Sequence, residues 1–357
     1  MYNSNGRVFF AVALITVLWA PVNLFVKFST SEISSAALLA FRWVSIAAVL
    51  WFLVLRPKFR EKVNVKMPTL RDGIFAFIAG FVFLGPGNTL FYLGLERTTS
   101  IESTVLNTSG PLWASLLAMF FLEEKVTLYR WLAIFIGVIG SYIIVMGFNA
   151  PHFGGETTVG NLIYMLGVLC EAAAMVLTTK VVLRSSGIGA TSWLALGVAI
   201  WSICVPLFMP SLFPFHYADF GSASLISLIY LILIAGVVCF CSWYKLAEKA
   251  PLSLMVICLG IEPIVAAILG NRFLGEPLTH ELFVGTFFVL ASLLVAAREK
   301  SLAQKIKTKD ALVTAVAGAK KMSDDQSNQN NCGCNNNPES GVDLTGVLQE
   351  SGKKSSK

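Results

Sequence analysis

The sequence predicts an all-α integral membrane protein with ten transmembrane helices, arranged as two inverted repeats of five helices. Three observations lead to this fold. The 357 residues are 55% hydrophobic and only 13% charged, with a mean hydropathy of +0.71, whereas soluble domains carry about 25% charged residues. The charges lie between long apolar runs, and residues about 152 positions apart match in sequence.

The apolar runs have the length of membrane helices, since around 20 mainly apolar residues cross a bilayer. The expected spans are 8–27, 35–55, 73–94, 102–122, 130–148, 160–180, 190–209, 224–245, 252–273 and 281–298. A signal peptide is the other interpretation of the first run. No small-residue cleavage site follows that run, and nine further spans come after it, so we expect a membrane helix instead.

Basic residues orient the chain across the membrane. With the N-terminus in the cytoplasm, the cytoplasmic loops hold thirteen Lys and Arg residues and the outer loops hold three. This distribution obeys the positive-inside rule, and ten spans return the C-terminus to the cytoplasm. It also accounts for the net charge of +6 without a nucleic-acid partner. The sequence thus predicts a multi-pass protein of the cell membrane with both termini cytoplasmic.

The repeat is clearest where "LNTSGPLWASLLAMFFLEEKVT" matches "VICLGIEPIVAAILGNRFLGEPLT". The residues paired in this way are Pro111 with Pro263, Phe121-Leu122 with Phe273-Leu274, Glu124 with Glu276, and Tyr92 with Tyr244. The halves are 8–148 and 160–298, followed by a tail at 299–357. Because each half has five spans, the second half enters the membrane from the opposite side. Inverted repeats of this kind are typical of secondary transporters.

The sequence resembles the drug/metabolite transporter superfamily, and within it the EamA-type exporters. The resemblance covers residues 8–298 and rests on the paired "FLEE" and "FLGE" ends, the prolines of spans four and nine, and "LWAPVNLFVK" in span one. It implies export of amino acids or other small metabolites. It also implies a central cavity between spans one, three, four, six, eight and nine, and repeats at 8–148 and 160–298.

Prolines interrupt three of the spans and mark candidate helix breaks at Pro86, Pro111 and Pro263. Proline lacks an N–H, so a carbonyl one turn earlier loses its partner. Within a membrane such a break is tolerated where helices, side chains or water satisfy the freed groups. Breaks at matching positions of two repeats point to a substrate site. The alternative is that these prolines only kink helices for packing.

Two acids, Glu171 and Glu262, lie deep in apolar sequence. A charged carboxylate at the bilayer centre costs roughly 2.5–3.5 kcal/mol on insertion scales, so each should face a cavity or a partner, or be protonated. We expect both acids to line one cavity and to bind protons or substrate. Glu262 has a structural alternative, in which its carboxylate accepts hydrogen bonds from backbone groups freed by Pro263.

Other polar and aromatic residues of the spans are candidate substrate contacts. They are Trp19, Asn23, Asn88, Asn107, Tyr92, Trp113 and Tyr244. Each asparagine has the alternative role of joining helices, and aromatic residues at span ends usually anchor the protein at the membrane interface. An aromatic, acidic cavity suits an amphipathic zwitterion or organic cation. Arg42 lies inside span two, where it could pair with Glu32, Glu96 or Glu102 near the outer face, and we expect a structural or gating role for it.

Enzyme signatures are missing from the sequence. It contains no GxxxxGK[ST], GxSxG or HExxH motif, and we expect no cofactor and no metal. The Cys-x-Cys pair of the tail, Cys332 and Cys334, offers two thiols, fewer than a closed zinc site needs. We therefore expect a non-enzymatic secondary active transporter that uses a gradient, with protons as the candidate coupling ion.

Two alternatives stay open, a passive metabolite channel or facilitator and a sugar-phosphate exchanger of the same superfamily. The sequence leaves both a monomer and a dimer possible. Its tail begins with a lysine-rich segment at 300–321, which could lie on the anionic inner leaflet, and ends in a polar segment that we expect to be disordered.

Overall fold

The computed structural model describes residues 2–121, 128–148, 155–211, 213–214, 221–247, 258 and 260–295. The chain divides into two units, residues 8–299 and residues 1–7 with 300–357, and the fold described here is that of the first unit. Its described residues are helical apart from short turns, without a β-strand. The predicted tail, including Cys332 and Cys334, lies outside the described residues.

Six helices of the described residues are long and apolar enough to cross a membrane. They run over Val8–Thr30, Ser35–Leu55, Leu70–Leu95, Glu156–Arg184, Gly187–Phe208 and Ser222–Trp243. Shorter apolar helices follow at Trp131–Met146 and His280–Val295. These eight correspond to spans one, two, three, five, six, seven, eight and ten of the prediction. The helices at spans four and nine are shorter, so the count of ten crossings stays a prediction.

Several spans consist of more than one helical element. The elements are α1 (Tyr2–Trp19) and α2 (Val22–Thr30), α3 (Ser35–Leu55), α4 (Pro57–Val63), α5 (Leu70–Ala79), η1 (Gly80–Leu84) and α6 (Gly85–Leu95), α7 (Ser100–Thr108) and α8 (Gly110–Phe121), α9 (Leu128–Met146), α10 (Glu156–Arg184), α11 (Gly187–Phe208), α12 (Ser222–Ile229), η2 (Tyr230–Cys239) and α13 (Phe240–Ala247), and α15 (Ile261–Leu274). The breaks follow the chemistry of proline, since Pro21 separates α1 from α2 and Pro111 follows the end of α7.

Spans three and eight each contain a π-helical segment, in which the hydrogen bonds run from residue i to i+5. Segment η1 covers Gly80–Leu84 and precedes Pro86 in α6. Segment η2 covers Tyr230–Cys239. Adding the repeat offset of 152 to the first segment gives residues 232–236, which lie inside the second. The two halves of the chain thus carry the same irregularity at the same place.

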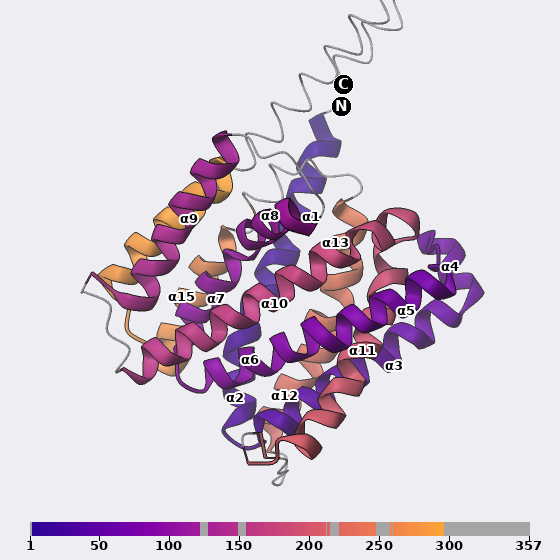
Figure 1. Ribbon diagram of the computed structural model, residues 1–357, viewed down its shortest axis with the longest axis horizontal. Helices are drawn as coiled ribbons and strands as arrows, with labels where there is room; N and C mark the ends of the chain where they lie inside the picture. Colours follow the sequence, from indigo (N-terminus) through magenta and orange to yellow (C-terminus); the bar gives the residue numbers. More distant parts are fainter. Residues whose placement is uncertain are drawn as a thin grey trace, which may run out of the picture. The chain divides into compact units, whose positions relative to one another are not determined.

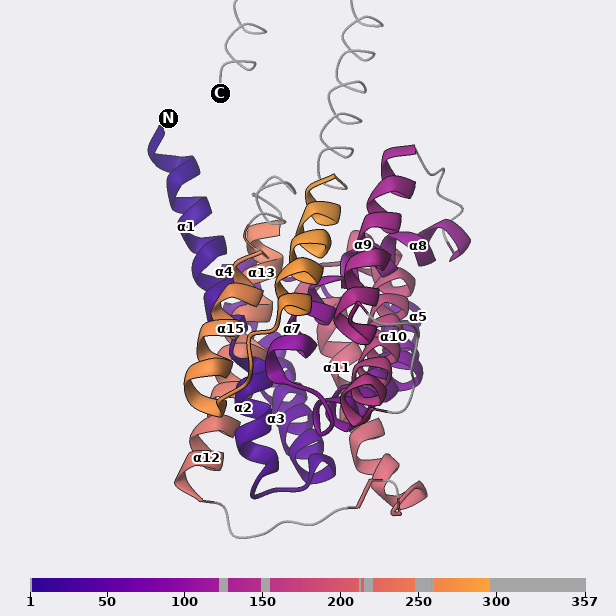
Figure 2. The same ribbon diagram turned by 90° about the vertical axis from the view of Figure 1, so that its left-hand side faces the viewer.

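Helices from the two halves pack against each other throughout the unit. Figure 1 shows α10 lying along α6, and α11 crossing α3. Figure 2 shows α2, α7 and α15 side by side, and α12 also contacts α2. Each of these contacts between halves joins one element of 8–148 to one of 160–298, so the halves share a core.

Glycine permits the closest of these approaches. A Cβ atom on Gly80 would lie 2.2 Å from the carbonyl oxygen of Leu194 in α11, and one on Gly197 would lie 2.2 Å from the carbonyl oxygen of Phe77. Both distances are shorter than a non-bonded contact. Spans three and seven therefore touch backbone to backbone, beside the π-helical segment of span three.

Candidate functional site

The two acids predicted for the site lie on α10 and α15, two elements of the second half that both pack against α7. Glu171 is half-buried near the middle of α10, and Glu262 is buried in the first turn of α15. The charge of Glu171 acts on Glu262. Neither carboxylate forms a hydrogen bond or an ion pair with any residue that the structure describes. Both predicted acids are thus left without a hydrogen-bonded or ion-paired partner among the described residues.

A buried cation completes this group of charges. Arg42, in α3, is only 8% exposed, and its charge interacts with that of Glu171. The hydroxyl group of Tyr164, in α10, is within electrostatic range of Arg42, Glu171 and Glu262. We call Arg42, Glu171 and Glu262 the charge cluster. It joins spans two, six and nine, and Tyr164 lies among its members.

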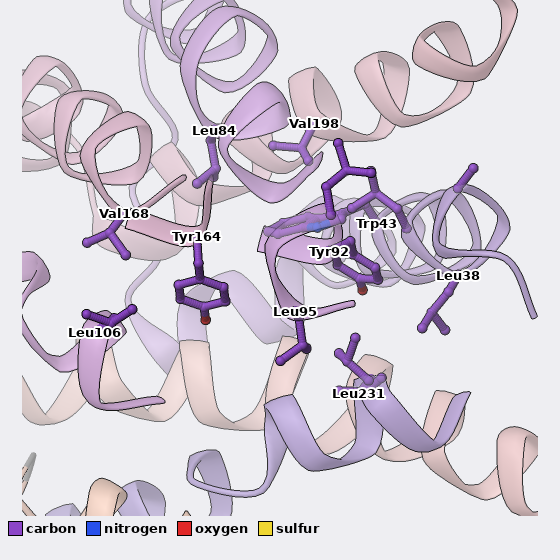
Figure 3. Close-up of a cluster of buried hydrophobic side chains, with 14 of the residues drawn as sticks. Leu38, Trp43, Leu84, Tyr92, Leu95, Leu106, Tyr164, Val168, Val198 and Leu231 are labelled. Carbon is purple, nitrogen blue, oxygen red and sulfur yellow. The ribbon is translucent and has the colours of Figure 1, made fainter. Parts of the chain in front are cut away.

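Arg42 has few partners for a buried guanidinium group. Nη1 donates to the hydroxyl oxygen of Tyr92 over 3.4 Å, the guanidinium carbon lies 5.8 Å from the centre of the Trp43 ring, and Nε is buried without a hydrogen-bond partner. Figure 3 shows Tyr92 and Tyr164 in the same buried cluster, with both hydroxyl groups directed toward the lower edge of the view.

The three acids that the sequence offered as partners for Arg42 form hydrogen bonds with other residues. Glu32 accepts a hydrogen bond from the backbone N–H of Gly221, and Glu96 accepts one from the Ser35 hydroxyl. Glu102 accepts bonds from Thr98 and Asn161. None of these three carboxylates pairs with Arg42.

Asn23 lies half-buried in α2 and joins three spans. Its Nδ2 is 3.1 Å from each of three acceptors, the hydroxyl oxygens of Ser103 and Thr104 in α7 and of Tyr164 in α10. Tyr164 donates its own proton toward Asn23 Oδ1 over 3.4 Å. Asn23 therefore joins helices and, through Tyr164, also borders the charge cluster.

Trp19, at the end of α1, packs on span eight. Its indole Nε1 donates to the carbonyl oxygen of Ala235 over 3.2 Å. Its ring lies edge-on to Phe240 at 5.2 Å and tilted against Trp243 at 5.5 Å, measured between ring centres. Ala235 belongs to η2. The indole therefore holds a carbonyl of the π-helical segment, and its contacts among the described residues are with span eight.

Of the remaining predicted residues, some form hydrogen bonds within the helix packing and one is exposed. Asn88 is buried, accepts from Trp43 Nε1 over 3.0 Å and donates to the Leu84 carbonyl over 2.9 Å, so it joins α6 to α3. Trp113 donates to the Ser109 hydroxyl over 3.1 Å. Asn107 is exposed beside the break between α7 and α8. The side chain of Tyr244 lies outside the described residues.

The three prolines occupy different surroundings. Pro263 is buried beside Glu262, Pro111 is exposed after the break of span four, and Pro86 is half-buried directly after η1. Pro263 thus lies within the first turn of α15, and no break follows it in that helix. No N–H group of the described residues donates to the Glu262 carboxylate, and residues 251–257 and 259 lie outside the described residues, so the structural alternative for Glu262 stays open.

Glu276 has a role that the sequence did not predict. Its Oε1 accepts from the Ser100 N–H over 2.7 Å, and its Oε2 accepts from the Ser100 hydroxyl over 2.7 Å and the Ile101 N–H over 3.1 Å. Lys27 Nζ lies 3.4 Å from Oε1. The "FLGE" end of span nine thus caps the start of α7 and pairs with span one. The matching residue, Glu124, lies outside the described residues.

Comparison with known families accounts for this arrangement. The model of a family described as the EamA-like transporter family matches residues 7–146 and, a second time, residues 158–298. The chain belongs to the EamA-like transporter family. The resemblance drawn from the sequence is thereby confirmed, and the protein is a multi-pass membrane transporter of small molecules rather than an enzyme.

Known relatives of this EamA-like protein are distant. An uncharacterized transporter of Archaeoglobus fulgidus is 23% identical over 81% of this chain and 98% of its own length. YetK, an uncharacterized transporter of Bacillus subtilis, is 24% identical over 58% of this chain and 62% of its own length. An S-adenosylmethionine uptake transporter of Rickettsia bellii is 29% identical over 33% of this chain and 38% of its own length.

The fold of the EamA-like chain also matches a solved crystal structure. The two superpose with a TM-score of 0.54 over 81% of this chain and 97% of that one, at 17% sequence identity. At this identity the match concerns the fold alone.

Proposed function

We propose that this EamA-like protein is a secondary active exporter of small amphipathic zwitterions or organic cations, amino acids first among them. It works by alternating access, with both termini in the cytoplasm of a cell whose outer membrane face is the more acidic. The observation that carries the proposal is the charge cluster, in which a buried cation and two acids on three different spans form no ion pair among the described residues.

The charges of the cluster favour a substrate that is itself charged. Burying an ion without a partner is expensive, so such a site is stable mainly when a ligand supplies the missing charge. Two carboxylates and one guanidinium group complement an amine and a carboxylate on one small molecule. The S-adenosylmethionine uptake transporter of Rickettsia supports this class, because its substrate carries both groups.

Proton coupling follows from the position of Glu171 and Glu262. Two carboxylates that interact within a low-dielectric interior repel each other, so the pair holds a proton unless a cation replaces it. A substrate amine entering from the cytoplasm would displace that proton. Reopening toward a more acidic exterior would return a proton and release the substrate, which gives export driven by proton entry.

The two alternatives left open by the sequence, a sugar-phosphate exchanger and a passive facilitator, predict different transport behaviour. A sugar-phosphate exchanger has to hold a dianion, yet Arg42 is the buried cation of the described residues and two acids lie near it. A passive facilitator would equilibrate its substrate across the membrane without coupling.

The test is transport by the full chain reconstituted into lipid vesicles. Radiolabelled amino acids, S-adenosylmethionine and glucose 6-phosphate are offered singly, with and without an imposed pH gradient. The proposal expects accumulation of at least one zwitterion above its external concentration, only with the gradient. Equilibration without accumulation would favour the facilitator, and uptake of the sugar phosphate alone would favour the exchanger.

A further inference from the structure

The buried edge of the Arg42 guanidinium group is the structural feature that the fold leaves unexplained. A guanidinium group presents five N–H donors in a fixed fork. Among the described residues, one nitrogen of Arg42 has a hydrogen-bond partner, which is Nη1 with Tyr92. Nε is fully enclosed and has none. An unpaired donor at a buried cation costs about 1–3 kcal/mol or more, and a purely structural arginine would be expected to satisfy it.

We propose that Arg42 is the carboxylate anchor of the substrate site, a deepening that rests on the proposed function of zwitterion transport. A carboxylate binds arginine through two parallel N–H···O bonds. The Tyr92 hydroxyl and the Trp43 ring contact the guanidinium group, while the buried Nε keeps a donor without a partner. Arg42 thus selects molecules that carry a carboxylate.

The other members of the cluster set the orientation of the bound molecule. Glu171 and Glu262 come from spans six and nine and carry the charge opposite to that of Arg42. A substrate carboxylate on Arg42 directs its amine toward these acids. The Tyr164 hydroxyl, held by Asn23, is within electrostatic range of Arg42 and of both acids. Arg42 therefore discriminates a zwitterion from the amine that lacks its carboxylate.

The neighbourhood explains why the anchor is arginine. Lysine is a point charge, whereas the planar fork of arginine matches the geometry of a carboxylate. Span two supplies no carboxylate of its own, because the described residues of α3 include no Asp or Glu. Glu32 and Glu96, at the ends of spans one and three, accept hydrogen bonds from Gly221 and Ser35 instead. The fork is consequently free for a ligand.

The test compares each zwitterion with its decarboxylated amine. The probes are L-phenylalanine with phenethylamine, and S-adenosylmethionine with decarboxylated S-adenosylmethionine, offered to vesicles that contain the full chain. We measure the ratio of zwitterion uptake to amine uptake. Arg42→Gln should lower that ratio at least tenfold, and Arg42→Lys should lower it less. Arg184→Gln, which removes a 68% exposed arginine of an ion pair with Asp72, should leave the ratio unchanged.

The outcomes separate the two proposals. If the wild-type protein prefers zwitterions and Arg42→Gln keeps that preference, the anchor is wrong and the proposed function stands. If Arg42→Gln and Arg42→Lys lower zwitterion and amine uptake equally, Arg42 is structural and the anchor is again wrong. If the wild-type protein transports no member of either pair, the proposed function and the anchor fail together.

Discussion

The carboxylate of Glu276, at the end of span nine, accepts hydrogen bonds from both the backbone N–H and the hydroxyl of Ser100, at the start of span four. Helices leave their first N–H groups without partners inside the helix, and a carboxylate there gains from the helix dipole as well. With Lys27 at 3.4 Å, one side chain ties spans one, four and nine together at one end of the bundle.

Glu276→Gln should lower the free energy of unfolding by about 2 kcal/mol, because bonds to a charged acceptor are worth about 1.5–3 kcal/mol. Equilibrium unfolding in detergent micelles measures this change. Asp72→Asn is the matched control, since its partner Arg184 is largely exposed and such pairs contribute about 0.2–1 kcal/mol. Equal losses in the two variants would show that Glu276 is no more than a surface charge.

Gly80→Ala should disturb the contact of spans three and seven, because its Cβ would lie 2.2 Å from the Leu194 carbonyl oxygen. Overpacking of this kind costs about 1–3 kcal/mol, and we expect a loss of about 2 kcal/mol in the same unfolding assay. Gly110→Ala is the control, because the added methyl group meets Val168 at 3.7 Å, an ordinary contact. If both variants unfold like the wild type, the close approach at Gly80 does not exist.

Glu262→Gln and Glu171→Gln test the coupling to protons. We expect that at least one of them abolishes accumulation driven by a pH gradient while leaving part of the substrate exchange between the two sides of the vesicle. Glutamine keeps the size of the side chain but cannot release a proton. The two modes of transport are measured on the same vesicles. Full, gradient-dependent accumulation by both variants would exclude both acids as proton carriers.

Reporter fusions at Asn149 and at Lys300 test the topology predicted from the charges. Five spans precede the first site and ten precede the second, so the reporters should lie on opposite sides of the membrane, with Lys300 in the cytoplasm. A truncation at Arg184, after six spans, serves as an internal check and should also place its reporter in the cytoplasm. If the reporters at Asn149 and Lys300 lay on the same side of the membrane, the two halves could not be inverted repeats.

Hydropathy and proline placement predicted much of the fold because each acts locally. The all-helical class and six of the long spans follow from the apolar solvent, and the break near Pro111 follows from the backbone chemistry of proline. The break at Pro21 follows the same chemistry but was not predicted. The segment η2 could not be anticipated in this way. Its sequence, YLILIAGVVC, contains no proline and reads as an ordinary apolar helix.

The candidate site was predicted from the types of residues in the spans and not from their tertiary contacts. Isolated acids in apolar sequence identified Glu171 and Glu262, because the cost of a buried charge is a general property of membranes. Tyr164, by contrast, looks like an ordinary aromatic residue, and only tertiary packing places it beside Asn23. The cap formed by Glu276 on Ser100 joins residues far apart in the chain, so no local pattern reveals it.

The matching π-helical segments also bear on the history of the chain. A π-helical turn arises when one residue is inserted into an α-helix and the helix absorbs it as a wider turn. The same extra residue per turn lies at Gly80–Leu84 and, one repeat later, inside Tyr230–Cys239. Two independent insertions at one position are a less economical explanation than a single insertion in an ancestral half that was later duplicated. The irregularity is then older than the two-repeat protein itself, and it has outlasted nearly all of the sequence around it.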